Sequence, residues 1–282
     1  MRGACVLTAL ANYRKALCSG DLPCDVFGSK KRVLCSTGFK YHLHSCRIPK
    51  KHKDSYRIYD PYLNKHCIVA CRGYFFSMDI VDDDNNVLPF DALEGGLERC
   101  IDLAKEKTMP QLGYLTTSDR DTCAKNRDLL IRAGGKKMLK ALERIESSVA
   151  LICLDETNTT KSDDFTNEIW HGGYGFYMNR WFDKPVQLIC ESNGRVAYYA
   201  EHSMLDGMQR ARLCHDIDQT QYETLSNVPV DRNVKIPFVY NVFEDTVNEK
   251  DEGFKEIHHA IQKGEHQEVW HFEEAKWISI DL

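Results

Sequence analysis

The chain has 282 residues, of which 28% are charged, and its formal net charge is −5 at pH 7. This mild acidity argues against a nucleic acid as the main partner, because phosphate binding requires clustered Lys and Arg side chains. The longest uninterrupted apolar run, residues 149–154, is much shorter than the ~18 residues that a membrane-spanning helix requires. We therefore expect a soluble protein with a large core, no nucleic-acid partner and no transmembrane segment.

The first predicted element is a helix over residues 5–17, where apolar side chains recur at helical spacing. Alternating apolar residues over 67–80, interrupted by Arg72 and Gly73, predict two strands, and residues 89–104 predict a second helix. Residues 112–117 predict a short extended segment. After it, Ser118 or Asp119 is a candidate cap for a helix that runs through Leu130.

The second half of the chain predicts further helices over residues 139–145, 206–217 and 253–263. Strands are expected at 148–154 and 267–272, and a hairpin is expected before residue 206. The sequence has no internal repeat and no linker that would separate two domains, so residues 1–282 are expected to form a single domain. The alternation of elements predicts an α/β fold, a mixed β-sheet flanked by helices.

Twelve cysteines raise the question of disulfides or zinc. They include no C-x-x-C pair and no paired Cys/His spacing typical of a zinc site. Several lie within apolar strand-like runs, such as residues 66–71, where cysteine behaves as a small hydrophobic residue. We expect reduced thiols, a reducing compartment and no metal site.

The most informative segment of the chain is residues 180–207. It reads Arg-Trp-Phe-Asp-Lys at 180–184, continues through an apolar run and an Asn-Gly turn, and ends in Glu-His-Ser-Met-Leu-Asp-Gly at 201–207. This order predicts a strand, a tight turn and a strand that ends at His202, with Asp206 at the start of a helix. A histidine there can act as a general base, because imidazole accepts a proton near neutral pH. Asp206 could orient that ring, cap the helix, or do both.

Four neighbouring residues are expected to support this site structurally. Arg180 and Asp183 could contact a substrate, but the favoured hypothesis is a buried ion pair between them that braces the strand beneath His202. Glu201 precedes His202 on the same predicted strand and should therefore face the opposite way. Ser203 completes the expected support.

The same segment resembles the signature of the choline/carnitine acyltransferase family, which includes an Arg-aromatic-x-Asp-Lys run and a Glu-His-Ser-x-x-Asp-Gly run. The resemblance extends to Cys-Arg-Ile-Pro at 46–49 and Gly-Tyr-Leu-Thr-Thr at 113–117, and it covers most of residues 1–220. At position 123 the family usually has a tryptophan, whereas this chain has a cysteine. The smaller side chain could leave a cavity that costs ~3–5 kcal/mol unless neighbouring side chains fill it.

The resemblance implies a chloramphenicol-acetyltransferase-like domain, of the CoA-dependent acyltransferase type. It corresponds to the N-terminal, histidine-bearing half of the family's two-domain unit. The C-terminal half, which carries the CoA-binding lysines and the Ser-Thr-Ser oxyanion motif in the family, is absent from this chain. The implied enzyme is a carnitine O-acyltransferase in which His202 is the general base and Asp206 orients it. It would move an acyl group, acetyl on the basis of residues 204–207, between CoA and carnitine. Acyl-CoA or CoA would be a co-substrate, with no cofactor bound permanently; the sequence leaves the CoA-binding residues unknown.

Two alternatives stay open. One is a truncated, non-catalytic paralogue that binds a partner, such as a complementing C-terminal half or a full-length relative, through an exposed apolar face. The other is a gene fragment whose complete product has both halves. The resemblance implies an intracellular protein. It does not tell whether the compartment is the mitochondrion, the peroxisome or the cytoplasm. It also leaves open the acyl-chain length and the choice between carnitine and choline.

Overall fold

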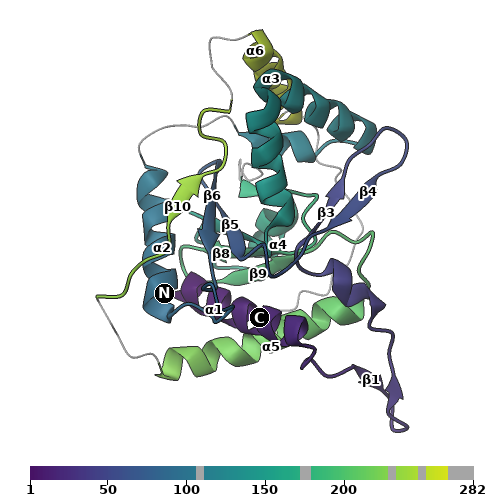
Figure 1. The fold of residues 1–282 in the computed structure, drawn as a ribbon, viewed down its shortest axis with the longest axis vertical. Helices are drawn as coiled ribbons and strands as arrows, with labels where there is room; N and C mark the ends of the chain where they lie inside the picture. Colours follow the sequence, from purple (N-terminus) through teal and green to yellow (C-terminus); the bar gives the residue numbers. More distant parts are fainter. Residues whose placement is uncertain (106–110, 172–178, 228–232, 247–251, 266–282) are drawn as a thin grey trace.

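A computed structural model describes residues 1–105, 111–171, 179–227, 233–246 and 252–265 of the chain. A six-stranded β-sheet lies at its centre, with helices on both faces (Figure 1). The strand order is β10-β6-β5-β7-β8-β9; β5 pairs in parallel with β7 and β7 with β8, whereas the other neighbours are antiparallel. The α/β class and the mixed sheet flanked by helices, both expected from the sequence, are confirmed. The strands of this sheet are β5 (His66–Cys71), β6 (Tyr74–Asp79), β7 (Leu151–Asp155), β8 (Gln187–Glu191), β9 (Val196–Tyr199) and β10 (Val239–Asn241).

The central strands are buried on both faces. In β5, Cys67 and Val69 pack into one hydrophobic cluster, whereas Ile68 and Ala70 pack into the other, because successive side chains of a strand point to opposite faces. Strands covered on both sides read as continuous apolar runs, which is the pattern of residues 66–71. The turn at residues 72–73, where both φ angles are positive, joins β5 to β6 as the sequence predicts.

Among the described residues, three helices cover one face of the sheet and three cover the other. The first face is covered by α1 (Arg2–Ser19), α2 (Phe90–Leu103) and α5 (Gly207–Asn227), and Figure 1 shows α1 and α5 side by side beneath the sheet. The opposite face is covered by α3 (Arg120–Ser147), α4 (Ser162–His171) and α6 (Glu252–Glu265). The helices predicted near residues 5–17, 89–104, 206–217 and 253–263 are confirmed as α1, α2, α5 and α6.

The segment before α3 differs from the prediction. Residues 112–117 do not form an extended segment; they contain the 3₁₀ helix η2 (Leu112–Thr116), whose residues are all buried. A short apolar run fits a strand and a buried helical turn equally well, so its pattern could not separate the two. Asp119 caps α3 by accepting a hydrogen bond from the Thr122 amide at 3.0 Å. The two helices expected here join at Gly135, whose φ of 55° and ψ of −137° are not helical.

Two small hairpins lie outside the central sheet. The hairpin of β1 (Val26–Phe27) and β2 (Arg32–Val33) projects from the body at the lower right of Figure 1, and that of β3 (Ser45–Ile48) and β4 (Ser55–Ile58) lies at the upper right. Another 3₁₀ helix, η1 (Thr37–Tyr41), connects the two hairpins. The sequence predicts neither hairpin, because strands of two to four residues are too short to show a period. The strand predicted at 267–272 lies outside the described residues.

All twelve cysteines are free thiols in this fold, and most of them are buried. Within the described ranges, no group of three or more His, Cys, Asp or Glu side chains is arranged to hold a metal ion. None of the helices described above has both the length and the apolar character that crossing a membrane requires.

Candidate active site

The candidate site is the loop of residues 200–206, which connects β9 to α5. Strands β8 and β9 pair as an antiparallel hairpin around Gly194, whose φ of 87° suits the tight turn that the Asn-Gly pair predicts. Since β9 is the edge strand of the sheet, the loop leaves the sheet at its rim. The hairpin is confirmed, but β9 ends at Tyr199, so His202 follows the strand by three residues instead of ending it.

His202 faces outward from a loop in which two side chains, those of Glu201 and Leu205, are buried. The imidazole of His202 is exposed, whereas Glu201 and Leu205 are buried, with 7% and 2% of their surfaces accessible. Glu201 and His202 therefore face opposite ways, as predicted. An exposed imidazole can meet a substrate that approaches from solvent and can take a proton from it.

The side chain of Glu201 holds the backbone around His202. Its Oε1 accepts a hydrogen bond from Arg47 Nη1 at 2.8 Å and another from the Ser203 amide at 2.9 Å. The Tyr56 hydroxyl donates to the hydroxyl oxygen of Ser203. The residues immediately before and after His202 are thus both tied to the β3–β4 hairpin.

A second arginine closes the loop from the side of the helix. Arg210, in the first turn of α5, donates from Nη2 to the carbonyl oxygens of Glu201 at 2.6 Å and of Leu205 at 2.9 Å. One guanidinium therefore joins the two ends of the segment that contains His202. Because the loop has no ladder hydrogen bonds of its own, these contacts substitute for regular secondary structure.

Asp206 lies directly before α5, as the sequence predicts. Its Oδ1 accepts a hydrogen bond from the Gly207 amide at 2.7 Å, and the carboxylate is exposed at the positive end of the helix dipole. Within the described ranges, the structure records no hydrogen bond between Asp206 and the His202 ring. The orienting role of Asp206 therefore stays a prediction.

The expected ion pair between Arg180 and Asp183 is wrong. Arg180 is fully buried and forms a bidentate pair with Asp155, with Nη1–Oδ1 at 3.1 Å and Nη2–Oδ2 at 2.6 Å. A turn that is closed by the Lys184 amide and the Trp181 carbonyl, at 2.9 Å, separates the two side chains. Arg180 consequently braces the end of β7, and Asp183 pairs with other arginines.

Asp183 lies in a buried network of charges next to the loop. It accepts hydrogen bonds from Arg120 Nη2 at 2.7 Å and from Arg47 Nε at 3.2 Å. Arg120 also donates from Nε to Asp54 Oδ2 at 2.6 Å. This network ties the start of α3 to the β3–β4 hairpin and, through Arg47, to Glu201.

Lys184 is the other buried cation of the segment. Its Nζ donates to the carbonyl oxygens of Ser45, Glu146 and Ser148 at 2.8–3.1 Å. Burial lowers the pKa of the Lys184 ammonium to about 8. The side chain joins β3, the end of α3 and the start of β7, so its role is structural.

The substitution of cysteine for the family's usual tryptophan at position 123 leaves only a small cavity. About 20 Å³ is empty beside Cys123, roughly the space of one water molecule. Neighbouring side chains therefore fill most of the space that a tryptophan would occupy. The cavity is lined by Pro49, Leu115, Thr116, Cys123, Arg127, Leu130, Leu142, Trp181 and Asp183.

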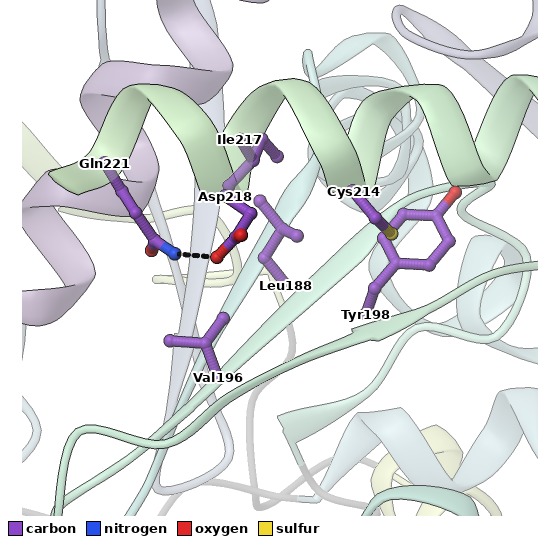
Figure 2. Close-up of a pocket in the computed structure, with 7 residues that line it drawn as sticks. All are labelled: Leu188, Val196, Tyr198, Cys214, Ile217, Asp218 and Gln221. Carbon is purple, nitrogen blue, oxygen red and sulfur yellow. Dashed lines mark hydrogen bonds between the residues drawn. The ribbon is translucent and has the colours of Figure 1, made fainter. Parts of the chain in front are cut away.

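Another cavity, shown in Figure 2, lies between α5 and the strands β8 and β9. It measures about 10 Å³, and its wall is apolar except where Gln221 Nε2 donates to Asp218 Oδ1 at 2.8 Å. Neither cavity approaches the ~300 Å³ of a typical ligand pocket. We therefore place the candidate site on the open surface around His202. The second cavity is lined by Leu188, Val196, Tyr198, Cys214, Ile217, Asp218 and Gln221.

Sequence reasoning missed three residues that contact the loop, namely Arg47, Tyr56 and Arg210. Arg47 lies within the Cys-Arg-Ile-Pro run that carries the resemblance, so a role for it could have been suspected. Tyr56 and Arg210 carry no such signal. Only the three-dimensional structure brings Tyr56, 147 positions away along the chain, next to Ser203.

Comparison with known proteins identifies the family. The model of the family described as Choline/Carnitine o-acyltransferase matches residues 1–277. The chain belongs to this family. The choline/carnitine O-acyltransferase resemblance that the sequence carries is therefore confirmed, and the mixed sheet flanked by helices is consistent with a CoA-dependent acyltransferase domain.

Relatives in the choline/carnitine O-acyltransferase family include enzymes named for different acyl groups. The chain is 28% identical over 207 residues to the mitochondrial carnitine O-palmitoyltransferase 2 of Xenopus tropicalis, covering 71% of this chain and 30% of that protein. It is also 28% identical over 235 residues to the carnitine O-acetyltransferase of Columba livia, covering 80% of this chain and 37% of that protein. The chain thus spans about a third of the length of these relatives.

Proposed function

We propose that the chain is the histidine-bearing part of a carnitine O-acyltransferase and that His202 is its general base. The observation that carries this proposal is the exposed imidazole of His202, held between two anchored residues at the rim of the sheet. The family match over residues 1–277 supports the reaction class. Residues 1–282 are proposed to form one domain, equivalent to the N-terminal half of the family's two-domain unit.

In the proposed reaction, neutral His202 accepts the proton of the carnitine hydroxyl while that oxygen attacks the thioester carbonyl of acyl-CoA. The C–O bond forms, the tetrahedral intermediate collapses, the C–S bond breaks, and the imidazolium returns its proton to the CoA thiolate. Asp206 orients the ring and Asp206 also caps α5. General-base help of this kind contributes about 10²–10⁴-fold to a rate.

The groups that stabilise the oxyanion and bind CoA are proposed to come from a complementing C-terminal half, supplied by the same gene product or by a partner. The relatives support this division, because the chain spans only about a third of their length. Losing one preorganised oxyanion donor typically lowers the rate by about 10²–10³. The chain alone should therefore be much slower than the complemented enzyme.

The acyl group is proposed to be acetyl. The support is the Met-Leu-Asp-Gly continuation at residues 204–207, which resembles acetyl-transferring members of the family. Sequence identity does not decide the matter, because the acetyl and palmitoyl relatives are equally similar to this chain. Rates with acetyl-CoA and palmitoyl-CoA at equal carnitine concentration would decide it.

The test of the base is acyl transfer by wild-type, His202→Ala and His215→Ala chains, each assayed alone and with a C-terminal half, by release of the CoA thiol from acetyl-CoA. His215 is an exposed histidine on α5 and serves as the matched control. We expect the His202→Ala rate to fall at least 100-fold and the His215→Ala rate to stay at the wild-type value. Equal rates in all three chains would remove His202 from the mechanism.

A second candidate function is a non-catalytic, partner-binding paralogue or gene fragment. The sequence leaves this alternative open. Wild-type chain that transfers no acyl group, alone or complemented, while it still binds a C-terminal half would support this alternative over the enzyme.

A further inference from the structure

The β3–β4 hairpin approaches the histidine loop with two side chains that belong together. In the register of the hairpin, Arg47 of β3 is the direct partner of Tyr56 of β4. Opposite residues of an antiparallel pair project from the same face of the hairpin. Arg47 and Tyr56 can therefore contact the same surface, and both contact the loop.

The two contacts bracket His202. Arg47 Nη1 donates to Glu201 Oε1 at 2.8 Å, and the Tyr56 hydroxyl donates to the hydroxyl oxygen of Ser203. Glu201 Oε1 also accepts the Ser203 amide at 2.9 Å, which closes a small ring of hydrogen bonds around the histidine backbone. Both neighbours of His202 are thus held, and its imidazole is exposed.

The hairpin can act as a fixed support because Arg47 is itself immobilised. Its Nε donates to Asp183 at 3.2 Å, and its backbone amide donates to the Asp183 carbonyl at 3.0 Å. Asp183 is in turn held by Arg120 at 2.7 Å, and Arg120 by Asp54 at 2.6 Å. An arginine with several charged partners loses little further freedom when it binds one more carboxylate.

We propose that Arg47 and Tyr56 are positioning residues that hold His202 in its reactive orientation from outside the central sheet. Their contribution differs from that of Arg210, which joins the two ends of the loop through carbonyl oxygens. A displacement of a catalytic group by about 1 Å can lower a rate by about 100-fold. This role presupposes the proposed function of His202, but the order of the loop can be measured without any catalysis.

The test compares the full wild-type chain with three variants of it: Tyr56→Phe, Ser203→Ala and the double variant that carries both changes. The matched control is Tyr62→Phe, because the Tyr62 hydroxyl also donates one hydrogen bond, at 3.2 Å to the Cys18 carbonyl, away from the loop. Hydrogen exchange of the Ser203 amide and the rate of His202 modification by diethyl pyrocarbonate report the order of the loop. Exchange of the β5 amides reports global stability.

We expect Tyr56→Phe and Ser203→Ala each to raise exchange of the backbone amide at position 203 and to alter His202 modification about 10-fold, with no further effect in the double variant. Exchange of the β5 amides should match the wild type in every variant. In Tyr62→Phe, all of the measurements should match the wild type. In the complemented enzyme, kcat should fall about 10-fold while KM for acetyl-CoA stays constant. Arg47→Lys, which keeps the charge but loses the forked geometry, should fall between wild type and Arg47→Met.

Wild-type exchange and modification rates in Tyr56→Phe and Ser203→Ala would overturn the positioning role, and so would additive effects in the double variant. If Arg47→Met does not fold, the Tyr56→Phe and Ser203→Ala variants still test the positioning role. Failure of the general-base proposal can be told apart from failure of the positioning role. In the first case His202→Ala would retain full activity, while Tyr56→Phe and Ser203→Ala would still change amide exchange and His202 modification.

Discussion

Among single residues, Lys184 departs from the usual behaviour of its type. Lysine is rarely fully buried, yet the Lys184 side chain is inaccessible and all three of its donors are matched by backbone carbonyls. Removing the ammonium would leave those buried oxygens without their donor, which is costly. The residue holds β3 against β7, and thereby holds the support on which the histidine loop rests.

The Lys184 ammonium should make stability depend on alkaline pH. Its folded-state pKa of about 8 lies below the ordinary value of 10.5, so between these pH values the unfolded chain binds more protons than the folded chain. The free energy of unfolding of the wild type, compared with that of Lys184→Met, should therefore rise with pH. The rise should be about 1.4 kcal/mol per pH unit at most and about 3 kcal/mol in total. Urea unfolding of both proteins from pH 7 to 10 measures this; parallel stability curves would contradict it.

Among the elements, those with a sustained apolar repeat or a distinct turn sequence could be predicted from the sequence. The helices α1 and α2 and the β5–β6 and β8–β9 hairpins follow from apolar spacing and from turns such as Asn-Gly. The β3–β4 hairpin could not be predicted, because four-residue strands carry no clear alternation. The signature places His202 at the end of the β8–β9 hairpin, although in the structure it lies three residues beyond the end of β9. Its supports Arg47 and Tyr56 depend on contacts between distant parts of the chain.

The ion pair of Arg180 shows why such contacts escape sequence reasoning. Asp183 is three positions away and was the natural partner, but the actual partner, Asp155, is 25 positions away on β7. Spacing along the sequence cannot show which of two carboxylates pairs with Arg180. The parallel pairing of β7 with β8 brings Asp155, at the end of β7, close to Arg180. The charge was expected to be buried and paired; the identity of its partner required the fold.

The packing between α3 and the Arg180–Lys184 segment gives a prediction at the same scale. Cys123 of α3 faces Trp181 across a cavity of about 20 Å³, so the surroundings have closed around the smaller side chain. Restoring the family's usual residue with Cys123→Trp should therefore destabilise the domain, by about 1–3 kcal/mol or more, through overpacking. The urea midpoint measures this, with Cys123→Ala as the control that only enlarges the cavity. A midpoint for Cys123→Trp at or above that of the wild type would contradict the prediction.

At the scale of the whole molecule, three buried histidines join separate layers of the fold. His42 Nδ1 lies 3.2 Å from the Tyr13 hydroxyl, and His44 Nε2 accepts from Arg14 Nε at 3.0 Å, so both contact α1. His66, at the start of β5, contacts α3, with its Nε2 at 2.7 Å from a backbone carbonyl. An imidazole nitrogen that accepts from an arginine carries no proton, so protonation of His44 opposes its contact with Arg14.

Burial lowers the pKa of all three rings, to about 3 for His42, about 2 for His44 and about 3 for His66. Below pH 6.5 the unfolded chain therefore binds more protons at these sites than the folded chain does, and stability must fall as the pH falls from 6.5 towards 3. Each ring contributes up to about 1.4 kcal/mol per pH unit, or about 4 kcal/mol per pH unit for the three together.

Urea unfolding at pH 7, 6 and 5 should show this loss. The variant His44→Gln keeps an acceptor for Arg14 but cannot titrate, so its slope against pH should be about one third smaller than that of the wild type. His215→Gln, which changes an exposed histidine of α5, should keep the wild-type slope. Equal stability of the wild type at pH 5 and pH 7 would show that these rings do not stay neutral in the folded protein. An unchanged slope in His44→Gln would exclude that residue from the effect.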